Sequence, residues 1–404
     1  MSTDPYPFQE ISKTFEKIRG HIKSYELSDT QRVYPAIRTR LDEVRGLYLD
    51  WIDVYEEYRR GFEKANLTRA LYPVARFLSS LGTGVEGSFF EVVKASVPIE
   101  VYFLVQYFYQ EFKCDSNFVL AEGAEFESDT VFGEISRELE RLNAPRPHGT
   151  QAETFLKKID NDNYTKIYYD SVMFDSPLTW PLLLHEVFHD IYQKDNIASI
   201  LKLPFTESWI PEVVIDLYAA MFFGPVYAVS LAKYHGRFPV RGGLLSHPSQ
   251  GPRLYGLLQL LGDMTEKKRD FPETVRKIIE DSFKTVNDIW SHYRKEERDV
   301  QDRVKEVYER VRGPAAEFHK SKGLKTFEEY SKLGGESLGK DFERVASYLA
   351  LGIPAAVNPR VLFNALVMSK TDPEYEYVGE SLKKWRLSEI WAQIRRESQE
   401  TLVS

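Results

Sequence analysis

The chain has 404 residues, of which 43% are hydrophobic, which is enough for two or three domains or for one large domain with a helical extension. A net charge of −8, from 53 basic and 61 acidic residues, argues against nucleic acid as the main partner. The single cysteine, Cys114, excludes an internal disulfide framework. The N-terminus lacks a signal-peptide pattern, and no apolar run reaches the length of a membrane span, so we expect a cytoplasmic protein.

Residues 1–115 are expected to form a helical N-terminal part. Apolar residues recur at spacings of three and four over 8–18 and again over 30–64, which is the pattern of amphipathic helices. This part either packs as a helical hairpin on the next domain or binds a regulatory protein partner. The glycine-rich segment 82–87 lacks the Lys-Ser/Thr of a phosphate loop, so we interpret it as a turn.

Residues 116–265 are expected to form the core of the protein. The segments 117–126 and 164–170 contain strand-forming residues, and the second alternates with a period of two. A helix is predicted over 177–193, beginning with an N-cap at Ser176 and a proline at its first position. The sequence therefore predicts an α+β fold that is predominantly helical, with a small sheet beside this helix.

The helix predicted over 177–193 contains His185, Glu186 and His189 in the order H-E-x-x-H. Positions i and i+4 of a helix are neighbours on one face, so both imidazoles can bind the same metal ion. Glu186 lies about 100° further around the helix, where it can reach a metal-bound water as a general base. This arrangement is that of zincins and predicts Zn²⁺ as the cofactor.

A catalytic zinc site also needs a third protein ligand and one open position. The downstream candidates are Glu207, Glu212, Asp216, His235 and His247. Glu212 follows His189 by 23 residues, on a helix predicted to start near 211 and to be interrupted at 224–225, and Asp216 lies one turn later. Glu207 is the reserve ligand, and His235 is expected to be exposed in a loop.

The order H-E-x-x-H followed by E-x-x-x-D resembles the gluzincins, the thermolysin-like superfamily of zinc metallopeptidases, over about residues 160–260. The resemblance implies that Glu212 is the third zinc ligand and that Asp216 accepts a hydrogen bond from His185. Such a carboxylate fixes the tautomer and the orientation of a metal-binding imidazole. It also implies a zincin-like core.

The segment SHPSQGPRL at 246–254 resembles the His-Pro…Arg segment of HtpX-type gluzincins. This second resemblance implies that His247 and Arg253 lie at the rim of the active site, with His247 as the best candidate for stabilising an oxyanion. The alternatives are a loop histidine that caps the next helix and an arginine in a structural ion pair. HtpX-type enzymes are membrane proteins, and this chain departs from them because it shows no membrane span.

Residues 266–404 are expected to form a helical C-terminal part. An apolar helix over 252–263 should cover the metal site before this part begins. One long charged helix is predicted over 272–312, with a solvated face or a surface for a partner, and 313–340 is expected to be loop-like. The remainder is interpreted as three short helices.

Together these features predict a zinc metallopeptidase whose partner is a peptide or protein substrate. Glu186 would activate the water, and a substrate peptide could add to an exposed edge of the strand at 164–170. Tyr234 and Tyr255 are weaker candidates for the oxyanion donor than His247. One alternative is a partner-binding helical protein with a structural or vestigial metal site, and another is a metal hydrolase that acts on a non-peptide amide.

Overall fold

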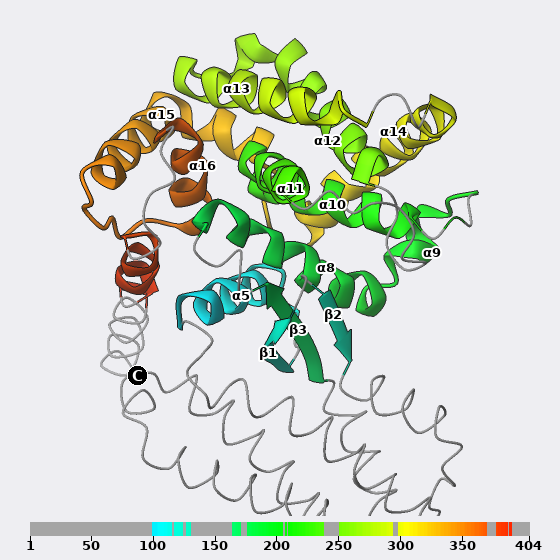
Figure 1. The fold of residues 1–404 in the computed structure, drawn as a ribbon, viewed down its shortest axis with the longest axis horizontal. Coiled ribbons are helices and arrows are strands. Elements are labelled where there is room, and N and C mark those ends of the chain that lie inside the picture. Colours follow the sequence, from blue (N-terminus) through cyan, green and yellow to red (C-terminus); the bar gives the residue numbers. More distant parts are fainter. Residues whose placement is uncertain are drawn as a thin grey trace, which may run out of the picture. The chain divides into compact units, whose positions relative to one another are not determined.

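In the computed structural model, most of the described residues are helical (Figure 1). The described residues are 99–114, 117–123, 127–130, 164–170, 176–204, 207, 209–237, 250–293, 298–369, 377–386 and 388–389. Contacts divide the chain into two compact units, Met1–Pro98 with Asp115–Tyr169, and Ile99–Cys114 with Asp170–Ser404. The predicted division into three parts stays a prediction. The helices predicted over 8–18 and 30–64 also stay predictions, because both ranges lie outside the described residues.

The first unit contributes a three-stranded sheet with the order β1-β3-β2. Its strands are β1 (Asn117–Gly123), β2 (Glu127–Thr130) and β3 (Tyr164–Asp170), and β2 pairs with β3 in the antiparallel sense. The prediction that β3 offers an exposed edge is wrong, because β3 is the central strand and its backbone groups face a neighbour on each side. A substrate peptide therefore cannot add to this strand.

The second unit is built from helices that surround α10. Its elements are α5 (Ile99–Glu111), the 3₁₀ helix η2 (Pro177–Leu182), α8 (Leu183–Lys194), α9 (Ile197–Leu201), α10 (Ile210–Phe223), α11 (Pro225–Arg237), α12 (Gln250–Glu266), the 3₁₀ helix η3 (Lys268–Asp270), α13 (Glu273–Trp290), α14 (Arg298–Ser321), α15 (Phe327–Ala350) and α16 (Pro359–Ser369). Helix α10 is apolar nearly all round and contacts α8, α11, α12, α14 and α15.

An aromatic core packs against α8. Phe188, which stands between the two histidines in the sequence, packs its ring 4.7 Å from that of Phe112, the residue that directly follows α5. The Phe112 ring also lies 4.9 Å from that of Phe222 of α10. These contacts bury aromatic surface and fix α8 against α5 and α10. The bulky residue inside the histidine motif therefore serves packing.

The start of the metal helix differs from the prediction. Residues Pro177–Leu182 form a 3₁₀ helix, and the α-helix begins only at Leu183. Pro181 has no N–H to donate to residue 177, so the tighter 3₁₀ turn replaces the first α-helical turns. Ser176 makes no side-chain cap; its carbonyl instead accepts hydrogen bonds from the backbone N–H and the hydroxyl of Thr179, at 2.9 and 2.8 Å.

The predicted interruption at 224–225 is confirmed and separates α10 from α11. Gly224 adopts a positive φ of 92°, and Pro225 opens the next helix. Asn364 of α16 stabilises the break: its amide nitrogen donates to the carbonyl of Phe223 at 2.8 Å, and its amide oxygen accepts from the N–H of Val226 at 3.4 Å. These bonds satisfy backbone groups that the break leaves free.

Two predictions for the later chain are wrong. The long helix expected over 272–312 is two helices, α13 and α14. The segment 313–340 is not a loop, because α14 continues to Ser321 and α15 starts with a capping box between Thr326 and Glu329. Gly339 lies inside α15 near Thr274 of α13, whose hydroxyl would be in ordinary van der Waals contact, at 3.4 Å, with an added Cβ.

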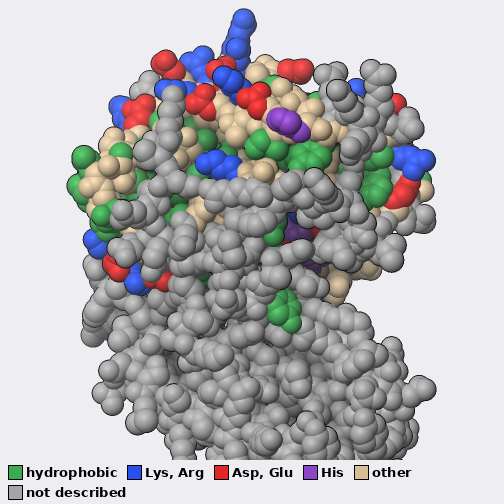
Figure 2. All heavy atoms as spheres, in the orientation of Figure 1, with side chains coloured by type: hydrophobic (Ala, Val, Ile, Leu, Met, Phe, Trp, Pro, Cys, Tyr) green, Lys and Arg blue, Asp and Glu red, His purple; other side chains and the backbone are tan. Residues whose placement is uncertain are grey.

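The surface of the second unit is mixed in charge. Lys and Arg side chains alternate with Asp and Glu side chains over the region of α13 and α15 (Figure 2), and the sequence predicted a charged face at the first of these helices. Among the described helices, none has the length and the apolar content that crossing a bilayer requires.

Candidate metal centre

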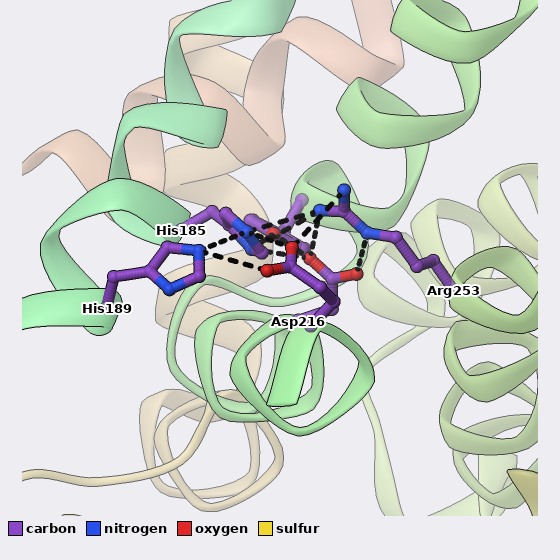
Figure 3. A network of polar contacts seen from close by, with 6 residues as sticks. His185, His189, Asp216 and Arg253 are labelled. Carbon is purple, nitrogen blue, oxygen red and sulfur yellow. Dashed lines mark hydrogen bonds and ion pairs between the residues drawn. The ribbon is translucent and has the colours of Figure 1, made fainter. Parts of the chain in front are cut away.

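Three side chains from two helices converge in the second unit. His185 and His189 come from α8, and Glu212 comes from the first turn of α10. Their ligand atoms all lie within 4.8 Å of one another. The Nε2 atoms of the two histidines are 3.0 Å apart, and the Glu212 carboxylate lies 3.0 Å from Nε2 of His185 and 3.4 Å from Nε2 of His189. Figure 3 shows His189 approaching the cluster from the side opposite Arg253.

These distances fit a shared metal ion. In a tetrahedral site with metal–ligand bonds of about 2.0–2.1 Å, neighbouring ligand atoms are about 3.3 Å apart. Two imidazole nitrogens that face each other at 3.0 Å repel through their lone pairs unless a proton or a cation lies between them. A carboxylate beside both nitrogens favours the cation. The three residues thus form a group that could hold a metal ion.

The cluster opens to solvent on the side of His189. The side chain of His189 is 27% exposed, whereas those of His185 and Glu212 are 5% and 8% exposed. Burial of the other two residues follows from the packing of α8 against the apolar helix α10. Solvent therefore reaches the cluster past His189.

The far side of His185 is held by a buried carboxylate. Nδ1 of His185 lies 2.8 Å from Oδ1 of Asp216, which is fully buried one turn after Glu212. A hydrogen on Nδ1 that is donated to this carboxylate leaves the lone pair of Nε2 directed at the cluster. The structure thus brings Asp216 to the position that the gluzincin resemblance implies.

Arg253 of α12 lies close to the carboxylates of both Asp216 and Glu212. It donates from Nε to Oδ2 of Asp216 at 2.6 Å and from Nη2 to Oδ1 at 2.9 Å, which is a bidentate pair. Its Nη1 lies 3.7 Å from the carboxylate of Glu212. Arg253 was expected at the rim of the site or, like Asp216, as a group that orders the candidate ligands from behind; the structure places it in an ion pair with Asp216, behind His185.

The charges of these residues perturb their protonation. Burial opposes ionisation of Asp216 and of Glu212, but Arg253 and His185 hold the pKa of each carboxyl well below its ordinary value. Burial and Arg253 lower the pKa of His185, but Asp216 and Glu212 outweigh them and raise it to about 9 in the metal-free protein. Burial and the neighbouring charge of His185 lower the pKa of His189 to about 3. A metal ion would displace the proton held by His185.

A divalent cation would also balance the buried charge. Glu186, which is 3% exposed, adds a third carboxylate to those of Glu212 and Asp216, and Arg253 is the cation that pairs with two of them. In the metal-free protein the raised pKa of His185, about 9, adds a second positive charge beside that of Arg253, and a divalent cation that displaced this proton would bring one positive charge more. Uncompensated charge in such a buried site costs several kcal/mol.

Tyr227 also belongs to this network, although the sequence analysis missed it. Its hydroxyl donates to Oδ1 of Asp216 at 2.5 Å and lies 3.4 Å from Nδ1 of His185. Tyr227 stands on α11, beyond the break at Gly224, so no helical spacing relates it to Asp216. A tyrosine in an apolar stretch carries no sequence signal that distinguishes this role from packing.

Among the described residues, the remaining candidates do not belong to the cluster of three. Glu207, the reserve ligand, pairs with Arg303 of α14 and is not in the cluster. His235 was expected to be exposed, and this is wrong: α11 extends past it, its ring is buried, and burial lowers its pKa to about 3. Tyr234 is half-buried on α11 beside His235, and Tyr255 stacks on Trp290, with ring centroids 5.2 Å apart.

His247 lies outside the described residues, so its role as an oxyanion donor stays a prediction. A scan against protein-family models, a search of curated proteins and a search of solved structures found no match to the chain. The function is therefore inferred from the residues of the candidate centre and from their geometry alone.

Proposed function

We propose that the protein is a zinc-dependent metallopeptidase of gluzincin type with a zincin-like core. The convergence of His185, His189 and Glu212 around one point is the observation that carries this proposal. Glu186 lies next to the first ligand on the same helix, and Asp216 orients that ligand from behind. A metal-binding triad with an adjacent carboxylate and an open fourth position is what metal-assisted hydrolysis requires.

The chain's own residues then divide the chemistry among them. Bound Zn²⁺ supplies a Lewis acid that polarises the scissile carbonyl and lowers the pKa of a water toward about 7. Glu186 accepts the proton of the attacking water and delivers it to the leaving amine. Asp216 and Arg253 keep His185 in one tautomer throughout, and His247 is the proposed donor to the developing oxyanion.

The substrate in this proposal is a peptide or protein, and the setting is the cytoplasm. Cys114 is a free cysteine, as a reducing compartment allows. The helical flanks on either side of the core are proposed to bind a regulatory protein partner, and no nucleic-acid partner is proposed because the chain is acidic.

Two other functions compete with this proposal. A structural zinc site is usually closed by four protein ligands, whereas the cluster formed by the described residues has three, so a purely structural metal is less well supported. Hydrolysis of a non-peptide amide would use the same residues. Substrate profiling with peptides and with small amides separates this second alternative from a peptidase.

The Glu186→Gln variant tests the proposed chemistry. This change keeps the size of the side chain and removes its basicity, so we expect the variant to bind one zinc ion as wild type does and to lose hydrolysis by about 10²–10⁴-fold. Metal content is measured by elemental analysis, and hydrolysis by mass spectrometry of a mixture of denatured proteins.

Glu306→Gln is the matched control, because Glu306 is an exposed residue of α14 whose partner among the described residues is Arg310. It should cut as wild type does. A Glu186→Gln protein that cuts at the wild-type rate contradicts the role of Glu186. A zinc-loaded wild type that cleaves none of the proteins contradicts the peptidase itself.

A further inference from the structure

Asp216 is the most heavily hydrogen-bonded carboxylate of the site. Its Oδ1 atom lies 2.8 Å from Nδ1 of His185, 2.9 Å from Nη2 of Arg253 and 2.5 Å from the hydroxyl of Tyr227. Its Oδ2 atom accepts from Nε of Arg253 at 2.6 Å. The two oxygens of a carboxylate offer about four lone-pair positions, so this group is close to saturated.

Tyr227 differs from the other donors in what it can do. Arg253 fixes the plane of the carboxylate through two parallel bonds and carries the charge that balances it. The hydroxyl of Tyr227 adds no charge, and it lies beside the bond between His185 and Asp216, 3.4 Å from Nδ1. Nη2 of Arg253 also reaches Oδ1, at 2.9 Å, but the Tyr227 hydroxyl makes the shorter bond, at 2.5 Å, and so adds a second restraint on where Oδ1 can move relative to the imidazole.

We propose that Tyr227 is a positioning residue of the metal centre, whose hydroxyl holds Asp216 where it accepts the Nδ1 hydrogen of His185 and so strengthens the binding of a divalent cation by Nε2. This inference rests on the proposed metal site, but it does not depend on peptide hydrolysis. It assigns a function to a residue of α11 that lies outside both sequence motifs.

Burial and the chain reversal at Gly224 hold the hydroxyl of Tyr227 against Asp216. The side chain is fully buried, and burial together with Asp216 raises the pKa of its hydroxyl well above the ordinary value, so the hydroxyl remains a donor. The chain reverses at Gly224, where Asn364 bonds to the backbone on both sides of the break. Tyr227 comes three residues later, so the same break that ends α10 brings its hydroxyl back onto Asp216.

A second tyrosine provides a matched control. Tyr308 of α14 donates its hydroxyl to Oδ2 of Asp263 at 2.5 Å, the distance at which Tyr227 donates to Asp216. Asp263 follows Arg253 by ten residues on α12, which places it about 15 Å further along the helix. Replacing either tyrosine by phenylalanine removes one equally short bond to a carboxylate, and only one of the two bonds touches the metal centre.

The experiment compares metal affinity in the full-length wild type, Tyr227→Phe and Tyr308→Phe. Each protein is stripped with a chelator, and Zn²⁺ and Co²⁺ are returned in competition with a chromophoric chelator. We expect the dissociation constant of Tyr227→Phe to rise about 10–100-fold, which is typical for loss of a group that orients a ligand, and that of Tyr308→Phe to stay within about twofold. The visible spectrum of bound Co²⁺ should change only in Tyr227→Phe.

Double variants test whether Tyr227 acts through Asp216. Asp216→Asn with Tyr227→Phe should bind metal about as weakly as Asp216→Asn alone, because residues of one network are not additive. If Tyr227→Phe does not fold without metal, it is refolded with Co²⁺ and the release rate of the ion is measured instead. Wild-type affinity and spectrum in Tyr227→Phe, or additive effects in the double variant, would overturn the proposal.

The outcomes also separate this inference from the proposed function. A wild type that binds neither ion overturns the metal site and the role of Tyr227 together. A wild type that binds zinc, weakens in Tyr227→Phe and cuts no peptide upholds the positioning role and overturns the peptidase.

Discussion

Replacing Glu212 by alanine should remove the metal. Its carboxylate lies 3.0 and 3.4 Å from the two imidazole nitrogens and supplies the one anionic ligand of the triad. Zinc bound by protein side chains gains on the order of 10 kcal/mol or more, so losing one of three ligands should cost about 3–4 kcal/mol. This corresponds to a rise of about 10²–10³-fold in the dissociation constant. Alanine would also leave the guanidinium of Arg253 facing the cation, 3.7 Å from where the carboxylate was.

Equilibrium dialysis against zinc at known free concentrations measures this loss, and Glu207→Ala is the control. Glu207 lies five residues earlier and pairs with Arg303, so its removal should leave the affinity for zinc unchanged. An unaltered dissociation constant in Glu212→Ala would refute the assignment of the third ligand. Loss of zinc in Glu207→Ala would show that the reserve ligand is the real one.

Three further outcomes follow from the structure. Gly224→Ala should lower the free energy of unfolding, measured by urea denaturation, by about 1–3 kcal/mol or more. The reason is that φ of residue 224 is 92° and the new Cβ would lie 2.2 Å from the ring of Phe327. The control, Gly313→Ala, lies on an open helical face and should be neutral or stabilising. Burial lowers the pKa of His319 to about 4, so the unfolded chain takes up this proton first as the pH falls below 6.5. The free energy of unfolding therefore falls as the pH decreases from 6.5 toward 4. In His319→Gln, its decrease between about pH 7.5 and pH 5 should be smaller by roughly 2 kcal/mol. Zinc at a thousand times its dissociation constant should stabilise the protein by about 4 kcal/mol relative to the chelated form in the same denaturation assay, and equal stability in both forms would contradict a bound metal.

The sequence predicted what is decided locally. His185 and His189 share a helical face because they are four residues apart, and the break at Gly224 follows from a glycine and a proline in succession. The strand at Tyr164–Asp170 was equally visible as a short alternating run. Each of these features depends on a few neighbouring residues, so tertiary contacts had little opportunity to change them.

Features set by distant contacts escaped prediction. The central place of β3 depends on pairing with two other strands, which a single strand does not encode. The helix α15 contains glycines, which resemble loop residues in the sequence, but it packs against α13 and α16. His235 is buried because α11 extends beyond it. In each case the deciding partner lies elsewhere in the chain.

The buried charges of the site argue for a metal more strongly than the motif does. A helical bundle without a ligand would gain by replacing Asp216 and Arg253 with apolar residues of similar volume, because a buried ion pair seldom repays its desolvation. Glu212 is a further buried anion, and it faces two imidazole nitrogens that repel each other without a proton or a cation between them. These costs fall together once a divalent cation occupies the centre, since it attracts both nitrogens and the carboxylate at the same point. In the metal-free protein the proton on His185 offsets part of these costs, and the affinity measurements on Glu212 and Tyr227 test whether a divalent cation takes its place.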